Sequence, residues 1–431
     1  MIRSLSGPSA LTPAVALSAV ALLATTLPTT NASASVPLSP YAKLTAFDRS
    51  ADDDFGYSVA IDGGVALVGA INDDDFGSSS GAVYRFDAAT GQQTAKITPG
   101  DGAAGDQFGF SVSADGGVAI VGARLDDDNG SSSGSAYLLG TASGQTTTKL
   151  TPINGPAGDQ FGRSVAIDGD TAVVGAFLND EITTNSGAAY VFDTATGQET
   201  ARLMPADAAA NDFFGISVAV DAGVALIGSY QDDDNGPSSG SAYLFDTATG
   251  QELAKLTAGD ASTNDLFGYS VALDGGVALV GAVGDDDNGS NSGSAYLFDA
   301  ASGQQLAKLL PDDGGGSHQF GWSVAIGEGV ALVGAYRDDD NGIDSGSAYL
   351  FDVATGQQLA KLTADDAALF DEFGFSVALN GGVALVGAPG DNSDTGAAYL
   401  FDVSAFVIPE PTAAALALLA VAAIARRRVG V

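Results

Sequence analysis

Residues 55–70 read FGYSVAIDGGVALVGA, and six similar stretches follow along the chain. The Phe-Gly pair that opens each stretch recurs every 53 residues, from Phe55-Gly56 to Phe373-Gly374. A pair of small residues, such as Gly69-Ala70, begins 14 positions after each of these Phe residues. Self-similarity at one fixed period indicates a repeat architecture. The chain is therefore predicted to fold as seven copies of one unit.

Each repeat contains four segments with strand character. In the first repeat, residues 55–61 alternate bulky and small side chains, and residues 65–70 are apolar throughout. A turn with two glycines separates these segments. Residues 82–86 are rich in aromatic side chains, and residues 94–98 mix apolar residues with Lys and Thr, as in an outer edge strand. Four antiparallel strands in roughly 50 residues predict a propeller blade. A β-solenoid is the alternative, although its coils are usually shorter.

The two ends of the repeat region complement each other. The seventh repeat reaches residues 397–402 and then lacks a fourth strand segment. Residues 41–45 read YAKLT and match the fourth segment of other repeats, such as Lys255-Leu256-Thr257. We therefore predict an all-β, seven-bladed β-propeller of four-stranded blades over residues 41–406. An N-terminal strand is expected to complete the last blade and so leave no open sheet edge between the ends.

The repeated pairs resemble a known family. Phe-Gly followed by Gly-Ala, most completely in Gly387-Ala388-Pro389, resembles the FG-GAP repeat of the integrin α-subunit propeller. The resemblance covers residues 41–406. It implies a seven-bladed propeller that mediates adhesion and ligand binding, with calcium bound in several blades.

The N-terminal residues 1–34 have the features of a secretory signal peptide. Arg3 precedes an apolar run over residues 11–27, and Ala32-Ser33-Ala34 offers small residues for cleavage. A membrane anchor is the alternative interpretation, but the run is short and is interrupted by Pro13. We therefore expect the chain to be exported.

Residues 407–431 are predicted to form a second targeting signal. An apolar stretch over residues 413–425 would rise only about 20 Å as a helix, less than the roughly 30 Å of a bilayer core. The tail resembles the PEP-CTERM sorting signal, which implies recognition by an exosortase and delivery to the cell envelope or exterior of a Gram-negative-type bacterium. That family often accompanies exopolysaccharide production. Membrane contact is expected only through this segment, before processing. The motif residues are Pro409, Glu410, Pro411, Arg426, Arg427 and Arg428.

Composition excludes several classes of function. The 431 residues carry a net charge of −37, so the surface repels nucleic acid, and no nucleic-acid partner is expected. The chain has no cysteine, which excludes disulfides and thiolate chemistry.

The acidic loop between the second and third segments is a candidate calcium site. Its clustered carboxylates could supply the six to eight oxygen ligands that calcium takes. However, the spacing departs from the alternating Asp-x-Asp-x-Asp-Gly pattern of the family's calcium loop, which lies between the first two strands. A solvated acidic turn is therefore the alternative. The candidate ligands are Asp126, Asp128, Asp232, Asp234, Asp285, Asp287, Asp338 and Asp340.

Three other features point to structure rather than chemistry. Asp53 and its equivalents, two residues before each Phe, are expected to fix the turn into the first strand. His318, the single histidine, replaces this Asp in the sixth repeat and is expected to form the same turn. Trp322, the single tryptophan, is expected to pack within the first strand.

The sequence therefore predicts a protein that is not an enzyme. An active site needs distinct residues that converge in one place, whereas nearly every polar feature here recurs in most repeats. The leading hypothesis is an extracellular binding or adhesion propeller that contacts a glycan, a matrix polymer or a protein. One alternative is a structural component of an exopolysaccharide matrix without a discrete ligand. The other is an enzyme that acts on polysaccharide.

Overall fold

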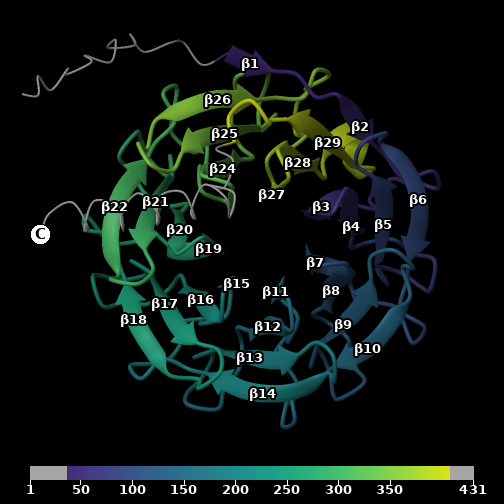
Figure 1. Cartoon of the computed structure of the whole chain (residues 1–431), viewed down its shortest axis with the longest axis vertical. Coiled ribbons are helices and arrows are strands. Elements are labelled where there is room, and N and C mark those ends of the chain that lie inside the picture. The colour runs from purple at the N-terminus through teal and green to yellow at the C-terminus, as the bar shows by residue number, and fades with distance from the viewer. Residues whose placement is uncertain (1–35, 408–431) are drawn as a thin grey trace, which may run out of the picture. The chain divides into compact units, whose positions relative to one another are not determined.

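The computed structural model describes residues 36–407, which contain 29 strands and one short helix, α1 (Asp391–Asp394). The strands form seven sheets arranged in a ring around a central axis (Figure 1). The predicted seven-bladed, all-β propeller is confirmed. The predicted signal peptide and the sorting motif lie outside the described residues.

Each blade is an antiparallel sheet in which the first strand of the repeat lies nearest the axis. The first five blades are β3 (Phe55–Asp62), β4 (Val65–Ala70), β5 (Ala82–Asp87), β6 (Gln92–Ile97); β7 (Phe108–Asp115), β8 (Val118–Ala123), β9 (Ser135–Gly140), β10 (Thr146–Leu150); β11 (Ser164–Asp168), β12 (Thr171–Ala176), β13 (Ala188–Asp193), β14 (Gln198–Leu203); β15 (Val218–Asp221), β16 (Val224–Ser229), β17 (Ser241–Asp246), β18 (Glu252–Leu256); and β19 (Phe267–Asp274), β20 (Val277–Ala282), β21 (Ser294–Asp299), β22 (Gln304–Leu309). The sixth blade has β23 (Ser323–Gly327), β24 (Val330–Ala335), β25 (Ser347–Asp352) and β26 (Gln358–Leu362), and the seventh has β27 (Ser376–Asn380), β28 (Val383–Ala388) and β29 (Ala397–Asp402).

The N-terminal segment closes the ring as predicted. Strand β2 (Ala42–Leu44) pairs antiparallel with β29 and supplies the missing outer strand of the seventh blade. Leu44 is fully buried in the core of that closure. One element differs from the prediction: β1 (Val36–Leu38) adds to β26 as a parallel strand, so the sixth blade has five strands.

The recurring Phe-Gly and Gly-Ala pairs hold neighbouring blades together. Phe55 is fully buried, and its ring meets those of Tyr84 and Phe86 in its own blade edge to face at 5.5 and 5.8 Å between centroids. Its backbone forms a bridge to Gly396 in the seventh blade. A Cβ atom on Gly69 would lie 2.2 Å from the carbonyl oxygen of Gly109 in the next blade. Only glycine allows this approach, so the small residues of the repeat are required where the blades pack.

Two sets of loops lie on the same face of the ring. Within each repeat the loop from the second to the third strand, and the loop from the fourth strand to the next blade, join the strand ends near the Phe-Gly pair. We call this the loop face. It carries the acidic loops and one mouth of the axial channel. Within residues 36–407, no helix is long and apolar enough to span a bilayer.

Candidate functional site

The acidic loops are organised around lysine side chains. In the fourth blade, Lys255 Nζ lies 2.9 Å from Asp232 Oδ2 and 2.6 Å from Asp234 Oδ2. A third carboxylate, that of Asp207, comes from the loop before the blade and lies at 2.8 Å. Tyr243 donates its hydroxyl hydrogen to Asp232 as well, at 2.7 Å. The loop therefore forms a compact cluster of three carboxylates around one ammonium group.

The same arrangement recurs in five other blades, with three carboxylates around the lysine in four of them and two in the seventh blade. Every predicted calcium ligand takes part: Asp126 and Asp128 bind Lys149, Asp285 and Asp287 bind Lys308, and Asp338 and Asp340 bind Lys361. Lys96 and Lys43 occupy the equivalent places in the first and seventh blades.

Two of these clusters have a geometry compatible with a metal ion. The carboxylate oxygens of Asp207, Asp232 and Asp234 all lie within 4.8 Å of one another, as do those of the equivalent cluster in the fifth blade. Calcium in these loops stays a prediction, and the structure adds that a lysine Nζ lies against the same oxygens. Burial opposes the charged form of Lys255, but the hydrogen bonds to the three carboxylates outweigh burial and raise its pKa.

The third blade replaces the cluster with a neutral variant. Asn179 stands where the other blades have a buried aspartate, and its amide donates to Asp159 Oδ2 at 2.6 Å. Arg202 takes the place of lysine and pairs with Glu181. Residue 156 is Pro, which has no N–H to donate to Asp159, so the Asn179 amide satisfies that carboxylate instead.

The turn predicted for Asp53 is confirmed, because its Oδ2 accepts a hydrogen bond from the Ser50 N–H at 2.6 Å. His318 does not make this bond. Its Nδ1 lies 3.4 Å from Asp338 Oδ2, at the edge of the lysine cluster of the sixth blade. His318 is therefore part of the loop packing, away from the residues that line the axial channel.

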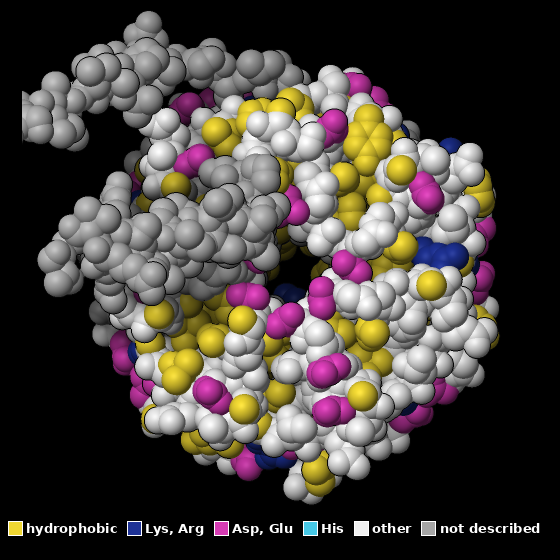
Figure 2. All heavy atoms as spheres, viewed as in Figure 1, with side chains coloured by type: hydrophobic (Ala, Val, Ile, Leu, Met, Phe, Trp, Pro, Cys, Tyr) yellow, Lys and Arg dark blue, Asp and Glu magenta, His cyan; other side chains and the backbone are white. Residues whose placement is uncertain are grey.

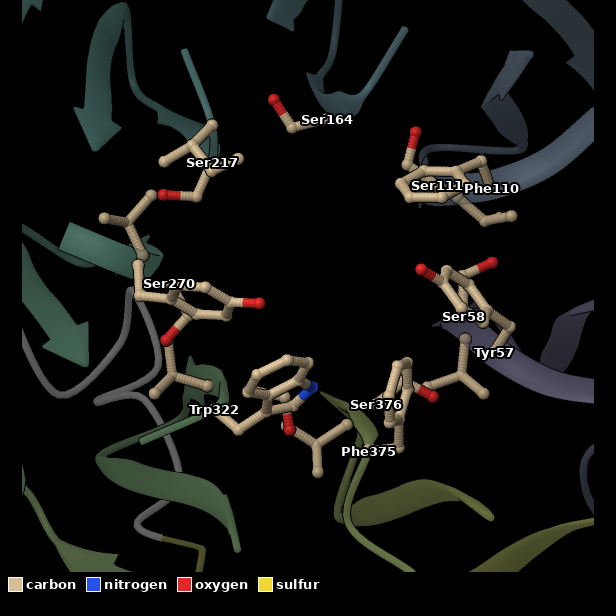
Figure 3. A pocket seen from close by; sticks show the side chains of 18 of the residues that line it. Tyr57, Ser58, Phe110, Ser111, Ser164, Ser217, Ser270, Trp322, Phe375 and Ser376 are labelled. Atoms are coloured by element: carbon tan, nitrogen blue, oxygen red, sulfur yellow. The ribbon is translucent and has the colours of Figure 1, made fainter. Parts of the chain in front are cut away.

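The axial channel contains a pocket of about 510 Å³ on the loop face. Figure 3 shows Tyr57, Phe110, Trp322 and Phe375 at the edge of its open space. The channel continues beyond a ring of valines into a second space of about 230 Å³. Figure 2 shows the other face of the ring, where the channel also opens at the centre, with acidic side chains around that second opening.

Aromatic side chains form a nearly continuous band around the mouth of the channel on the loop face. Consecutive ring centroids lie 4.5 to 5.8 Å apart, and most of the rings are partly exposed. The guanidinium of Arg163 closes the circle, since it lies 4.8 Å from the ring centroid of Phe110 and 5.9 Å from that of Phe177. We call the aromatic members the collar: Tyr57, Phe110, Phe177, Phe213, Tyr230, Tyr269, Trp322, Tyr336 and Phe375.

The serines next to the collar are already bonded. Each donates its hydroxyl hydrogen to the Phe-Gly carbonyl oxygen of the following blade, at 2.7 to 2.9 Å. These bonds tie the inner strands of successive blades together. The pocket therefore presents aromatic faces on a rigid frame, and its serines serve mainly to hold that frame.

The residue before each Phe-Gly pair has a left-handed backbone. These seven non-glycine residues have φ between 51° and 58°, a conformation that costs about 1 kcal/mol or more. Two of them, Phe213 and Glu372, carry side chains into the collar or the pocket. The strained turn thus aims variable side chains at the mouth. The residues are Asp54, Gln107, Gln160, Phe213, Leu266, Gln319 and Glu372.

Charges at the mouth are separated. Arg163 lines the pocket from the third blade, and Arg124 lies beside it, with its guanidinium 4.0 Å from the Phe110 ring centroid. Glu372 lines the pocket from the seventh blade, across the axis. Burial, together with the charge of Asp344, raises the pKa of Glu372 to about 7. Burial and the charge of Asp394 also raise the pKa of Asp54 to about 6.

A sequence profile for the FG-GAP repeat matches the chain seven times and covers most of it. The matched segments are residues 39–86, 92–139, 145–192, 198–245, 251–298, 304–351 and 357–401. The chain belongs to the FG-GAP repeat family. A search among curated proteins found no match.

The matches to the FG-GAP profile also show how the ring closes. Each one begins near an outer strand and continues through the first three strands of the next blade. The first match therefore starts beside β2, and the last ends with β29, to which β2 is paired. Every FG-GAP unit in this propeller thus spans the contact between two blades.

Sequence reasoning missed the collar of this FG-GAP propeller. Trp322 does pack against Tyr269 and Phe375, but it also lines the pocket. The available signal was the position directly after Phe-Gly, which reads Tyr, Phe, Arg, Ile, Tyr, Trp and Phe in successive repeats. The lysine of the acidic clusters was visible too, as one basic residue on each fourth strand.

Proposed function

We propose that this FG-GAP propeller is an exported, non-catalytic binding protein of the cell envelope or exterior, and that it holds a glycan in the axial pocket. The collar is the observation that carries the proposal. Partly exposed aromatic rings on a rigid frame offer flat apolar faces, against which the C–H faces of sugar rings can pack. The pocket volume of about 510 Å³ lies within the usual range for small-molecule sites.

A binding role is better supported than catalysis. Glycoside hydrolysis normally uses two carboxyl groups roughly 5 to 10 Å apart on either side of the scissile bond. Among the described residues that line the pocket, Glu372 is the one carboxylate. The serines there donate to backbone carbonyls, and His318 lies outside the pocket lining.

Calcium dependence and adhesion belong to the same proposal. The acidic loops share the loop face with the collar, so an ion bound in them and a ligand in the mouth would lie on the same side of the ring. The resemblance to the integrin propeller and the predicted sorting signals support a place outside the cytoplasm. A protein partner on the loop face would be a second route to adhesion.

Binding of the full-length protein to a panel of immobilised polysaccharides tests the proposal. We expect saturable binding to at least one polymer. Replacing one collar ring, as in Tyr269→Ala, should weaken it roughly tenfold, because a stacking face is lost. Leu306→Ala, at an exposed residue on the outer strand β22, is the matched control and should change nothing.

Other outcomes would redirect the assignment. Bulk, salt-sensitive association that never saturates and ignores Tyr269→Ala would favour the matrix-component hypothesis. New reducing ends released from the polymer would favour the enzyme hypothesis.

A further inference from the structure

The positive charges of the propeller are mostly committed to structure. The six lysines and Arg202 all bind carboxylates of the acidic loops. Arg85 donates to backbone carbonyls of the next blade. Arg163 differs, because no carboxylate lies within ion-pair distance of it among residues 36–407. Its charged group lies instead against the aromatic rings of the collar, where it lines the pocket.

Arg124 strengthens the positive field at the same point. Both guanidinium groups lie within 5 Å of the Phe110 ring centroid, and Arg124 Nε donates to Gln107 Oε1 at 2.9 Å. Burial lowers the pKa of Arg124, and the charge of Arg163 lowers it further. Two adjacent cations repel each other, and an anion between or beside them would relieve that repulsion.

The opposite wall of the pocket sets the orientation of a ligand that carries such an anionic group. Glu372 faces the pocket from the seventh blade, and the charges near it are those of Asp344, Arg337, Asp394 and Asp54. Three of these four neighbours are acidic. An anionic group would therefore be drawn toward Arg163 and repelled from the side of Glu372. The uncharged part of the ligand would then lie along Trp322, Phe375 and Tyr57.

We propose that the axial pocket recognises an acidic sugar, whose carboxylate binds Arg163 while its ring packs on the collar. The inference rests on the proposed function and names the class of glycan. Arginine suits this role because its planar fork can hold both oxygens of a carboxylate. The ligand unit is a hexuronic acid, either free or at the end of a chain.

Trp322 reports directly on the site, because it is the single tryptophan of the chain and lines the pocket. Fluorescence of the full-length protein would be titrated with glucuronate, with neutral glucuronamide, and with acetate. We expect glucuronate to bind at least about tenfold tighter than glucuronamide, as a charge-assisted hydrogen bond implies. Acetate alone should give no comparable response.

Arg163→Ile isolates the charge. Ile216 occupies the same position in the fourth blade, so the inner strand accommodates this side chain. The variant should bind glucuronate and glucuronamide equally weakly, with its melting temperature as the check on folding. Arg49→Gln removes one exposed positive charge elsewhere and should keep the preference for the acid.

The outcomes separate the two proposals. Equal binding of acid and amide by the wild-type protein would overturn the acidic-sugar inference and leave a neutral-glycan pocket. A matching response to acetate would overturn it in favour of a simple anion site. No response to any sugar, together with no polysaccharide binding, would overturn the proposed function as well.

Discussion

Replacing Lys255 by Met removes the ammonium group to which Asp207, Asp232 and Asp234 are bonded. The Met side chain keeps most of the apolar stem of Lys255, which is paired with Tyr243 on the neighbouring strand β17. The substitution therefore removes the charge with little change in volume. It tests whether the lysine is the internal counter-ion of the acidic loop.

The expected cost follows from burial. The Asp232 side chain is only 4% exposed, and removing the partner of a buried charge costs about 3 to 5 kcal/mol. The Lys255 side chain is 19% exposed, so water can partly replace it, and the lower end of that range applies. Asp234 is 63% exposed and adds little. We expect a loss of about 3 kcal/mol, or roughly 6 °C in melting temperature at about 2 °C per kcal/mol.

Urea unfolding of the full-length protein would measure the loss. Arg49→Met is the matched control, since it removes one positive charge from an exposed residue and should stay within about 0.5 kcal/mol of wild type. Calcium gives a second measurement. In the Lys255→Met variant the three carboxylates are free to bind it, and calcium at a hundredfold excess over Kd would restore about 2.7 kcal/mol.

Two results would refute this reasoning. A Lys255→Met variant as stable as wild type would show that the lysine is not needed to balance the carboxylates. A calcium effect as large in wild type as in the variant would show that calcium and the ammonium group do not compete for the same oxygens.

Three further predictions concern closure, pH and blade packing. Leu44→Ala should cost about 2 to 4 kcal/mol in urea unfolding, because Leu44 is fully buried where β2 closes the ring; a change below 0.5 kcal/mol would contradict closure through β2. The pKa of Glu372 is raised from 4.5 to about 7, so the folded state holds its proton more tightly and wild type loses stability as pH rises from about 4.5 to about 7. Glu372→Gln should remove that loss and be more stable than wild type by on the order of 1–2 kcal/mol at pH 8, but not at pH 4; a gap independent of pH would count against the assignment. Gly228→Ala should prevent folding or cost more than about 4 kcal/mol, since its Cβ would lie 1.9 Å from a carbonyl oxygen of the next blade; Gly100→Ala, in open space, should be neutral by thermal melting.

The architecture could be predicted from the sequence because the same residue pattern recurs in seven repeats. Strand periodicity that is ambiguous in one copy becomes firm when it recurs at a constant spacing, and the YAKLT segment at residues 41–45 could be recognised only by comparison with the other fourth strands. Strand β1 could not be predicted in this way. It has three residues and no counterpart in the repeat, and it forms because the edge of β26 is open to a parallel neighbour.

The chemistry of the acidic loops was only half visible. Asp232 and Asp234 belong to one run of aspartates, so their clustering was evident in the sequence. Lys255 follows Asp232 by 23 residues and reaches it only across two strands of the blade. Asp207 comes from the loop before the blade. The carboxylate cluster in the sequence therefore suggested a bound calcium ion. In the structure the cation at this place is the ammonium group of Lys255.

The collar was hidden for the opposite reason. Recurrent residues such as Phe55 and Gly69 are required for packing within and between the blades, and this requirement explains why they recur in all seven repeats. The serines and valines that line the axial pocket recur in every repeat and belong to the frame. The repeats differ at the position after Phe-Gly and at the position before it, where side chains such as Tyr, Arg, Trp and Glu reach the pocket. Regularity in the sequence argued against a specialised site, yet a ring brings one variable residue from every blade to a common axis. Seven similar blades can therefore form one asymmetric pocket, with Arg163 and Glu372 on opposite walls. In a repeat protein of this kind, function is better sought at the positions that break the repeat than at those that define it.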